Sequence, residues 1–378
     1  MPASKASPAP KRTTGASIST NPRVGGDALV ALDALTLGNP LWLLRKECSI
    51  SKQNSPVEGF PVVAGVAIEP PYGLIWNSWK EGRVVPFLGA GASLVGRTPG
   101  VPFNCNNPAS LPSGFDLSVC LAQEVQFPAE DDREKEDLAK VSSYYIEMAG
   151  RRGLRRRLRQ MLNADCQPGP LHQFLACVPA PQVIVVTNYD TLLERAFIAA
   201  GKPYDLVIYP ADRKDIASSV LWWPHSAAEP LPIKPNELDI DLSKTNVIYK
   251  MHGTVRHETE KWDNFVITEE DYVEFLSRMT TNTAVPSLFY PHFRERSFLF
   301  LGYSLRDWNL RVVLKNLSKH LVIREASGGE DNEEVPPSWS IQLRPSELER
   351  RLWAKKNVNI FDLSLDDFVV RMRQKMGG

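Results

Sequence analysis

Short apolar runs alternate with amphipathic segments along the chain from Tyr72 onward. The apolar runs are rich in Val, Ile, Leu and Phe and are bounded by turn residues, which predicts strands buried on both faces of a parallel sheet. They lie at residues 84–88, 183–186, 206–209, 247–251, 297–301, 338–342 and 358–361. Helical spacing fits between most of them, for example at residues 192–200, 269–278 and 308–317. This alternation predicts a doubly wound, Rossmann-like α/β fold with a mostly parallel sheet.

A helical region interrupts this pattern between the first two predicted strands. It follows an irregular stretch, residues 97–113, that is rich in Pro and Asn. Apolar residues then recur at helical spacing in residues 114–125, 138–146 and 154–162. We therefore expect a helical insertion covering about residues 114–178.

The start of the chain does not follow the alternation. Residues 1–25 are rich in Pro, Ala, Ser, Thr and Lys and contain almost nothing to bury, which is typical of a disordered tail. Residues 26–71 are more apolar and end in Pro70 and Pro71, which interrupt the chain before the alternating region. The sequence does not indicate a role for this segment. The main domain is therefore expected to cover residues 72–378.

Charge and hydropathy exclude several classes of protein. The chain has 44 Lys and Arg against 44 Asp and Glu, so no global field indicates nucleic acid or an anionic membrane as a partner. No apolar run approaches the roughly 18 residues of a membrane span, and the start lacks the apolar core of a signal peptide. The five cysteines include no Cys-x-x-Cys pair, and their odd number suggests reduced thiols. We therefore expect a cytoplasmic protein without a metal site.

A dense basic cluster lies near the end of the helical insertion. No aromatic residues are interleaved with its arginines to stack on bases, so a solvated helix face explains the cluster better than an anion or nucleic-acid site. The cluster consists of Arg151, Arg152, Arg155, Arg156, Arg157 and Arg159.

A glycine-rich turn follows the first predicted strand, with Gly89, Ala90 and Gly91 leading to Ser93. Glycines after a buried strand let the backbone turn tightly and approach a ligand closely, and bare N–H groups attract phosphate. The usual dinucleotide fingerprint would need a third glycine where Leu94 stands, so this is not the dehydrogenase pattern. The same residues also fit a plain tight turn.

Polar groups follow three other predicted strands. In a doubly wound sheet, ligands bind beyond the carboxyl ends of the strands, so these groups would meet in one crevice. Each has a simpler explanation alone, because Asn188 or Asp190 can cap the next helix and His252 can be an ordinary loop histidine. Their coincidence in place favours a functional site. The groups are Thr187-Asn188-Tyr189-Asp190, His252-Gly253 and Gly302-Tyr303-Ser304.

Five stretches carry a family resemblance, and they occur in the family's order. They are FLGAGAS (residues 87–93), PLHQFLA (170–176), VTNYDTLLERA (186–196), KMHG (250–253) and FLGYSLRD (300–307). Together they resemble the sirtuin-like superfamily, most closely its bacterial branch of stand-alone NAD hydrolases used in antiphage defence. The resemblance covers roughly residue 72 to the C-terminus and implies a sirtuin-type NAD-binding catalytic domain.

The resemblance implies a role for each matched residue. Asn188 would lie beside the nicotinamide ribose and His252 would be the base acting on a ribose hydroxyl. Such groups suit the chemistry, because cleaving the nicotinamide–ribose bond develops oxocarbenium character while a carboxamide orients water and an imidazole takes a proton. Asp190 either helps to bind the substrate or caps its helix. The cofactor-binding residues implied are Gly89, Ala90, Gly91, Ser93, Thr187, Asp190, Gly302 and Ser304.

The chain departs from sirtuin deacylases in three respects. It has no cysteine pairs for a zinc ribbon, Thr187 stands where those enzymes usually carry Gln, and the Asp-Phe-Arg after the glycine turn is missing. Residues 100–102 or 111–114 would occupy the lid instead, and we favour the second because a predicted helix follows directly. Without a ribbon there is little sign of an acyl-lysine groove, so water is the simplest acceptor.

The resemblance therefore implies an NAD glycohydrolase that is silent until a protein partner or phage-derived trigger activates it. It also implies that the protein is a homo-oligomer. The alternatives are a module that senses NAD or ADP-ribose derivatives without turnover, and a deacylase or ADP-ribosyl transferase. Hydrolysis and cyclisation are not distinguished. For Arg306 and Asp307 the sequence leaves three roles open, namely binding the cofactor, pairing with each other and lying at a subunit contact.

Overall fold

The structure is a computed structural model. It describes residues 69–94, 97, 101–162, 164–211, 213, 216, 218–256, 259–303, 313–314 and 336–377. All of them lie in one compact unit, Ala64–Gly378. The expected tail of residues 1–25 and nearly all of the segment 26–71 lie outside the described residues, as do most of the expected helix 308–317.

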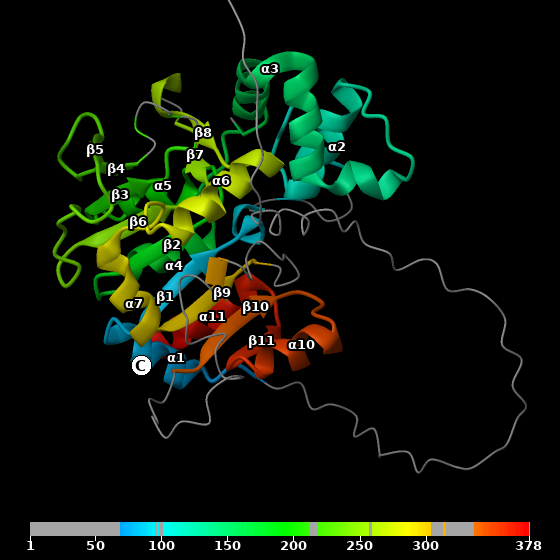
Figure 1. The fold of residues 1–378 in the computed structure, drawn as a ribbon. Coiled ribbons are helices and arrows are strands. Elements are labelled where there is room, and N and C mark those ends of the chain that lie inside the picture. Colours follow the sequence, from blue (N-terminus) through cyan, green and yellow to red (C-terminus); the bar gives the residue numbers. More distant parts are fainter. Residues whose placement is uncertain are drawn as a thin grey trace, which may run out of the picture. The chain divides into compact units, whose positions relative to one another are not determined.

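A nine-stranded sheet forms the centre of the fold, in the order β11-β10-β9-β1-β2-β6-β3-β4-β5 (Figure 1). The first seven of these strands run parallel, and β4 and β5 are antiparallel additions at one edge. The predicted doubly wound, mostly parallel fold is confirmed. The strands are β1 (Val84–Leu88), β2 (Val183–Val186), β3 (Tyr204–Ile208), β4 (Val220–Trp223), β5 (Leu231–Ile233), β6 (Asn246–Lys250), β9 (Ser297–Leu301), β10 (Ser338–Gln342) and β11 (Val358–Asp362).

Helices cover both faces of the sheet because alternate strand residues point to opposite sides. In β2, Val183 and Val185 belong to one apolar core, whereas Ile184 and Val186 belong to the other. Residues of α6 (Glu269–Thr280), α7 (Tyr290–Glu295) and α10 (Glu347–Ala354) pack into the first core. Residues of α1 (Tyr72–Lys80), α4 (Pro170–Cys177), α5 (Leu192–Ala199) and α11 (Leu365–Met376) pack into the second.

The predicted helical insertion between the first two strands is confirmed. It contains α2 (Gly114–Glu124), the short 3-10 helix η2 (Asp132–Glu136) and α3 (Leu138–Leu162), which breaks at Gly150 (φ 72°). A third apolar core joins α2 and α3 to the hairpin of β7 (Gly253–Thr254) and β8 (Asn264–Phe265). Figure 1 shows these two helices grouped at the hairpin side of the sheet.

Several arginines of the basic cluster form ion pairs, either within this insertion or with its neighbours. Arg151 pairs with Asp271 at 2.8 Å, Arg157 pairs with Glu124 at 2.7 Å, and Arg159 pairs with Asp263 at 2.6 Å. Much of the positive charge is thus neutralised within the protein. Among the described residues, no helix is both long and apolar enough to cross a lipid bilayer.

The expectation of reduced thiols is wrong for one pair of cysteines. Cys105 and Cys120 form a disulfide that ties the irregular stretch before α2 to the helix itself, while Cys166 and Cys177 are free. The spacing of 15 residues gave no sign of the pair, because disulfide connectivity depends on how the chain folds rather than on sequence distance.

Removing this disulfide should destabilise the protein under oxidising conditions. For a closed loop of 15 residues, the variant Cys105→Ser/Cys120→Ser is expected to lose about 3 kcal/mol of unfolding free energy because its unfolded chain gains freedom. Urea titrations with and without dithiothreitol measure the effect, with the exposed Cys177→Ser as control. Equal stabilities of the oxidised wild type and the double variant would show that the cross-link does not stabilise the fold.

Candidate functional site

The centre of the sheet is a topological switch point. From β1, the chain continues to β2 on one side, whereas β9 flanks β1 on the other side. Loops leave this point in opposite directions, which opens a crevice beyond the carboxyl ends of the strands. The glycine turn η1 (Ala90–Ser93) follows β1 directly into this crevice.

The glycine turn packs backbone against backbone on the residues that follow β9. Gly91 N–H donates to the Gly302 carbonyl at 2.8 Å, and Gly89 N–H donates to the Leu301 carbonyl at 3.1 Å. A Cβ on Gly89 would lie 2.4 Å from the Tyr303 ring, and one on Gly91 would lie 2.8 Å from the Gly302 oxygen. These glycines are therefore required by the contact between two loops, whatever ligand the turn binds.

A hydrogen-bonded chain links the turn to the residues after β2. The Asn188 side-chain amide donates to the Gly89 carbonyl at 2.9 Å and to Ser93 Oγ at 2.6 Å. Ser93 Oγ in turn donates to Asp190 Oδ2 at 2.5 Å. Both amide hydrogens of Asn188 are thus used, which leaves its Oδ1 as the atom that can accept a hydrogen bond from a ligand.

Asp190 has a clear structural role in this arrangement. Its Oδ1 accepts the Leu192 N–H at 3.0 Å, at the start of α5, while its Oδ2 holds Ser93. Asp190 is buried. Thr187 donates from Oγ1 to the Leu88 carbonyl at 3.1 Å and so fastens the same segment to β1.

His252 lies directly beyond β6, on the other side of this segment. Its ring packs edge-on against Tyr272 and Phe275, with centroids 5.5 and 5.6 Å away. Burial among these rings lowers the pKa of His252 to about 4, because desolvation disfavours the imidazolium form. The imidazole is therefore neutral at physiological pH and can accept a proton.

One cavity of about 570 Å³ brings these side chains together. The segment at residues 111–114 that we favoured as lid contributes Leu111, Pro112 and Gly114 to its wall, whereas Val101 and Pro102 line a different cavity. The end of η2 and the start of α3 form another part of the wall through residues 136–139. From the predicted site the cavity is lined by Ala90, Ser93, Thr187, Asn188, Asp190, His252 and Gly302.

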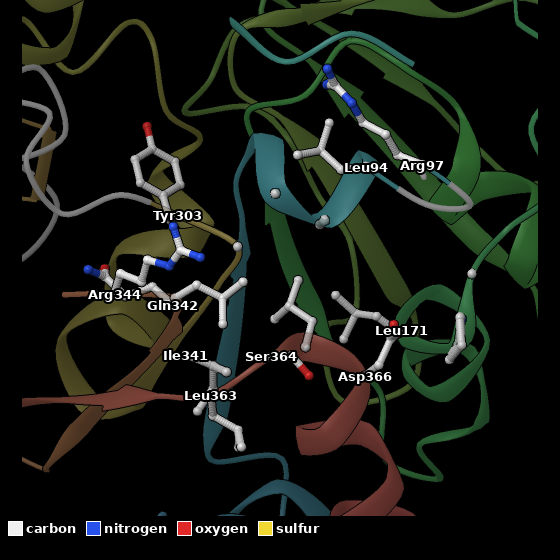
Figure 2. A pocket seen from close by; sticks show the side chains of 17 residues that line it. Leu94, Arg97, Leu171, Tyr303, Ile341, Gln342, Arg344, Leu363, Ser364 and Asp366 are labelled. Carbon is white, nitrogen blue, oxygen red and sulfur yellow. The ribbon is translucent and has the colours of Figure 1, made fainter. Parts of the chain in front are cut away.

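A second cavity of about 790 Å³ borders the glycine turn at Gly91 and Ala92, and Figure 2 shows side chains that line it. Gly302 and Tyr303 line both cavities, so the two meet at the end of β9. Figure 2 shows Ser364 and Asp366 at the start of α11, with Leu171 of α4 nearby. Gly91 also lines this cavity, which has a size suited to a small molecule.

Two predicted site residues fall outside this set. Gly89 lines neither of these two cavities, since it is covered by Tyr303. Ser304 lies outside the described residues, as do Arg306 and Asp307. Within the described part of the chain, no group of three or more His, Cys, Asp or Glu side chains is placed to hold a metal ion.

Sequence reasoning missed several residues of these cavities. Tyr272 of α6 packs edge-on against His252, and nothing in its sequence context indicated this. Arg344 and Asp366, which line the second cavity, follow β10 and β11 closely. The rule that ligands bind beyond strand ends would have found both, had it been applied to the last two strands.

Known proteins are similar to this chain over part of their length. Residues 182–361 match the family described as SIR2-like domain. The NAD(+) hydrolase ThsA of Acinetobacter baumannii (strain 532279) is 28% identical over 214 residues, which is 56% of this chain and 38% of that protein. ThsA of Cytobacillus dafuensis is 27% identical over 209 residues, which is 55% of this chain and 36% of that protein.

Two further likenesses are more distant. Defense-associated sirtuin 2 of Bacillus subtilis is 21% identical over 247 residues, covering 65% of this chain and 20% of that protein. A solved structure titled "Structural Basis for the Mechanism and Regulation of Sir2 Enzymes" aligns with 81% of this chain and 97% of its own, at 11% identity and a TM-score of 0.32. The chain spans only about a fifth to two fifths of the three curated relatives. The expected resemblance to sirtuin-like proteins is confirmed by the match of residues 182–361 to the SIR2-like family and by these relatives.

Proposed function

We propose that this chain hydrolyses NAD+ at the nicotinamide–ribose bond and releases nicotinamide and ADP-ribose. The observation that carries the proposal is the single cavity lined by Asn188 and His252 beside the glycine turn. Relatives named NAD(+) hydrolase and defence-associated sirtuin support the same chemistry and an antiphage role. Because constant NAD loss would harm the host, we further propose that a protein partner or phage-derived signal triggers the activity.

The two cavities suit the two halves of the substrate. Nicotinamide and its ribose would lie in the cavity with Asn188 and His252, and adenosine would lie in the cavity lined by Arg344 and Asp366. The diphosphate would then cross the glycine turn beside Gly302 and Tyr303, which line both cavities. The N–H groups of Gly89, Gly91 and Ala92 already donate within the protein, so other groups must supply part of its hydrogen bonding.

Asn188 and His252 would divide the chemistry between them. Because Asn188 presents Oδ1 as an acceptor, it can hold a ribose hydroxyl or the attacking water. His252, being neutral, can take a proton as oxocarbenium character develops on the ribose. Ser93 and Asp190 hold the Asn188 amide in its orientation through their hydrogen bonds. Water is the proposed acceptor, with cyclisation of ADP-ribose as the competing outcome.

The low pKa of His252 leads to a prediction about pH. Because burial lowers that pKa to about 4, the base stays deprotonated as pH falls, and kcat/KM for NAD should stay flat from about pH 8 to about pH 5. An ordinary histidine would cause half-loss near pH 6.5. Initial rates across this range, with thermal unfolding measured at each pH, test this. A half-loss near 6.5 in folded protein would contradict a buried neutral base.

The proposed function is tested by NAD consumption with the purified protein, its products resolved by chromatography. Wild type and Asn188→Ala are compared with and without extract from phage-infected bacteria. NAD loss that appears with extract and disappears in the variant would support a triggered hydrolase. Binding of NAD without turnover under every condition would instead favour a sensing module.

A further inference from the structure

A lysine is buried directly beneath the proposed site. Lys250 is the last residue of β6, and its side chain is fully buried. Its Nζ donates to the main-chain carbonyl of Asp190 at 2.5 Å and lies 3.5 Å from Glu194 Oε1 in the first turn of α5. Ile248, two residues earlier on the same face of β6, belongs to the second apolar core.

Stability alone does not explain why a charged pair is buried at this position. A buried ion pair loses the hydration of both charges, and apolar residues of similar volume usually stabilise such a position at least as well. Both carboxylate oxygens of Glu194 lack a hydrogen-bond partner within the described part of the chain, so Lys250 is the counter-charge that compensates this carboxylate. The position therefore calls for an explanation other than packing.

The contact of Lys250 with Asp190 supplies that explanation. Lys250 is absent from the wall of the cavity, so it does not touch a ligand there. Its Nζ bonds to the main chain of the segment that follows β2, and that segment carries Asn188 and Asp190. Because the Asp190 carboxylate holds Ser93, and Ser93 holds the Asn188 amide, a shift of the Asp190 main chain would turn Asn188 away from its orientation.

We propose that Lys250 is a positioning residue for the nicotinamide–ribose side of the site, with Glu194 as its counter-charge. This inference rests on the proposed function, and it assigns the support on which Asn188 depends. His172 of α4 is also buried and interacts electrostatically with Lys250, and desolvation lowers its pKa, so that it adds no second positive charge there. The bond from Nζ to the Asp190 carbonyl, rather than the ion pair, carries the positioning.

Two variants separate positioning from stability. Lys250→Met/Glu194→Leu replaces the pair with apolar residues, so its Tm should lie within about 5 °C of wild type, whereas Lys250→Met alone strands a buried carboxylate and should lose more. Despite its stability, the double variant should lose about 10²-fold in kcat with little change in KM, because Asn188 is misplaced. Hydrogen–deuterium exchange should also rise in residues 187–192.

Glu194→Gln provides the complementary test. Lys250 keeps its hydrogen bond to the Asp190 carbonyl in this variant, so the protein should lose Tm but keep kcat within about threefold of wild type. The matched control is Lys202→Met, which removes a lysine that donates to the Val178 carbonyl away from the cavity.

Two results would overturn the proposal. One is a double variant with wild-type exchange at residues 187–192; the other is a Glu194→Gln protein that loses as much kcat as the double variant. Should the wild type not hydrolyse NAD, the proposed function fails, whereas the exchange measurement still decides whether Lys250 orders this segment. In that case, protection of residues 187–192 from hydrogen–deuterium exchange that is the same with and without Lys250 would be enough to reject the positioning role.

Discussion

Replacing His252 with alanine is expected to lower kcat for NAD hydrolysis by about 10²–10⁴-fold, the usual contribution of a general base. The residue lines the same cavity as Asn188, and burial keeps its imidazole neutral. Alanine removes the proton acceptor but leaves the glycine turn and the Asn188 amide in place, so NAD should still bind. Initial rates on the activated protein and calorimetric titration of NAD separate the two effects.

The control for this prediction is His225→Ala. His225 is exposed and lines neither cavity, so its loss should change neither the rate nor the affinity. Because His252 packs edge-on against Tyr272 and Phe275, alanine also leaves a void, and thermal unfolding must show that the variant is folded. A folded His252→Ala protein with a wild-type rate would remove His252 from the mechanism.

The strand positions could be predicted because continuous apolar runs are buried on both faces of a parallel sheet. Val183–Val186 and Ser297–Leu301 are found as expected. The order of strands was beyond sequence reasoning, since β6 enters between β2 and β3 although β3 precedes it in the chain. The short edge strands β4 and β5 were missed because their pairing depends on a neighbour rather than on local pattern.

The site divides in a similar way. Asn188 and His252 could be expected together because both follow strands whose carboxyl ends meet at one edge of the sheet. What the sequence could not reveal is contact between loops far apart in the chain, such as Gly91 with Gly302, or a buried partner such as Glu194 beneath Lys250. Both depend on side chains and turns that converge only after the strands are ordered.

The contact between these loops leads to the second large effect, which is expected for Gly302→Ala. Gly302 has φ +67°, and a Cβ there would lie 2.5 Å from the Ala92 nitrogen and 2.7 Å from the Gly91 carbonyl carbon. Both atoms are main chain, so the glycine turn must open to make room. We expect a loss of about 4 kcal/mol or more in the free energy of unfolding, together with weakened NAD binding.

Gly201→Ala is the matched control, because Gly201 has φ +63° with open space around it. That variant carries only the cost of the left-handed conformation, about 1–2 kcal/mol, and should bind NAD normally. Urea titration and calorimetry of both proteins measure the difference. Equal losses of stability would mean that the turn yields to the added methyl group. Gly302 would then be required for its backbone conformation alone, and its close packing on the glycine turn would not be what shapes the two cavities that it lines.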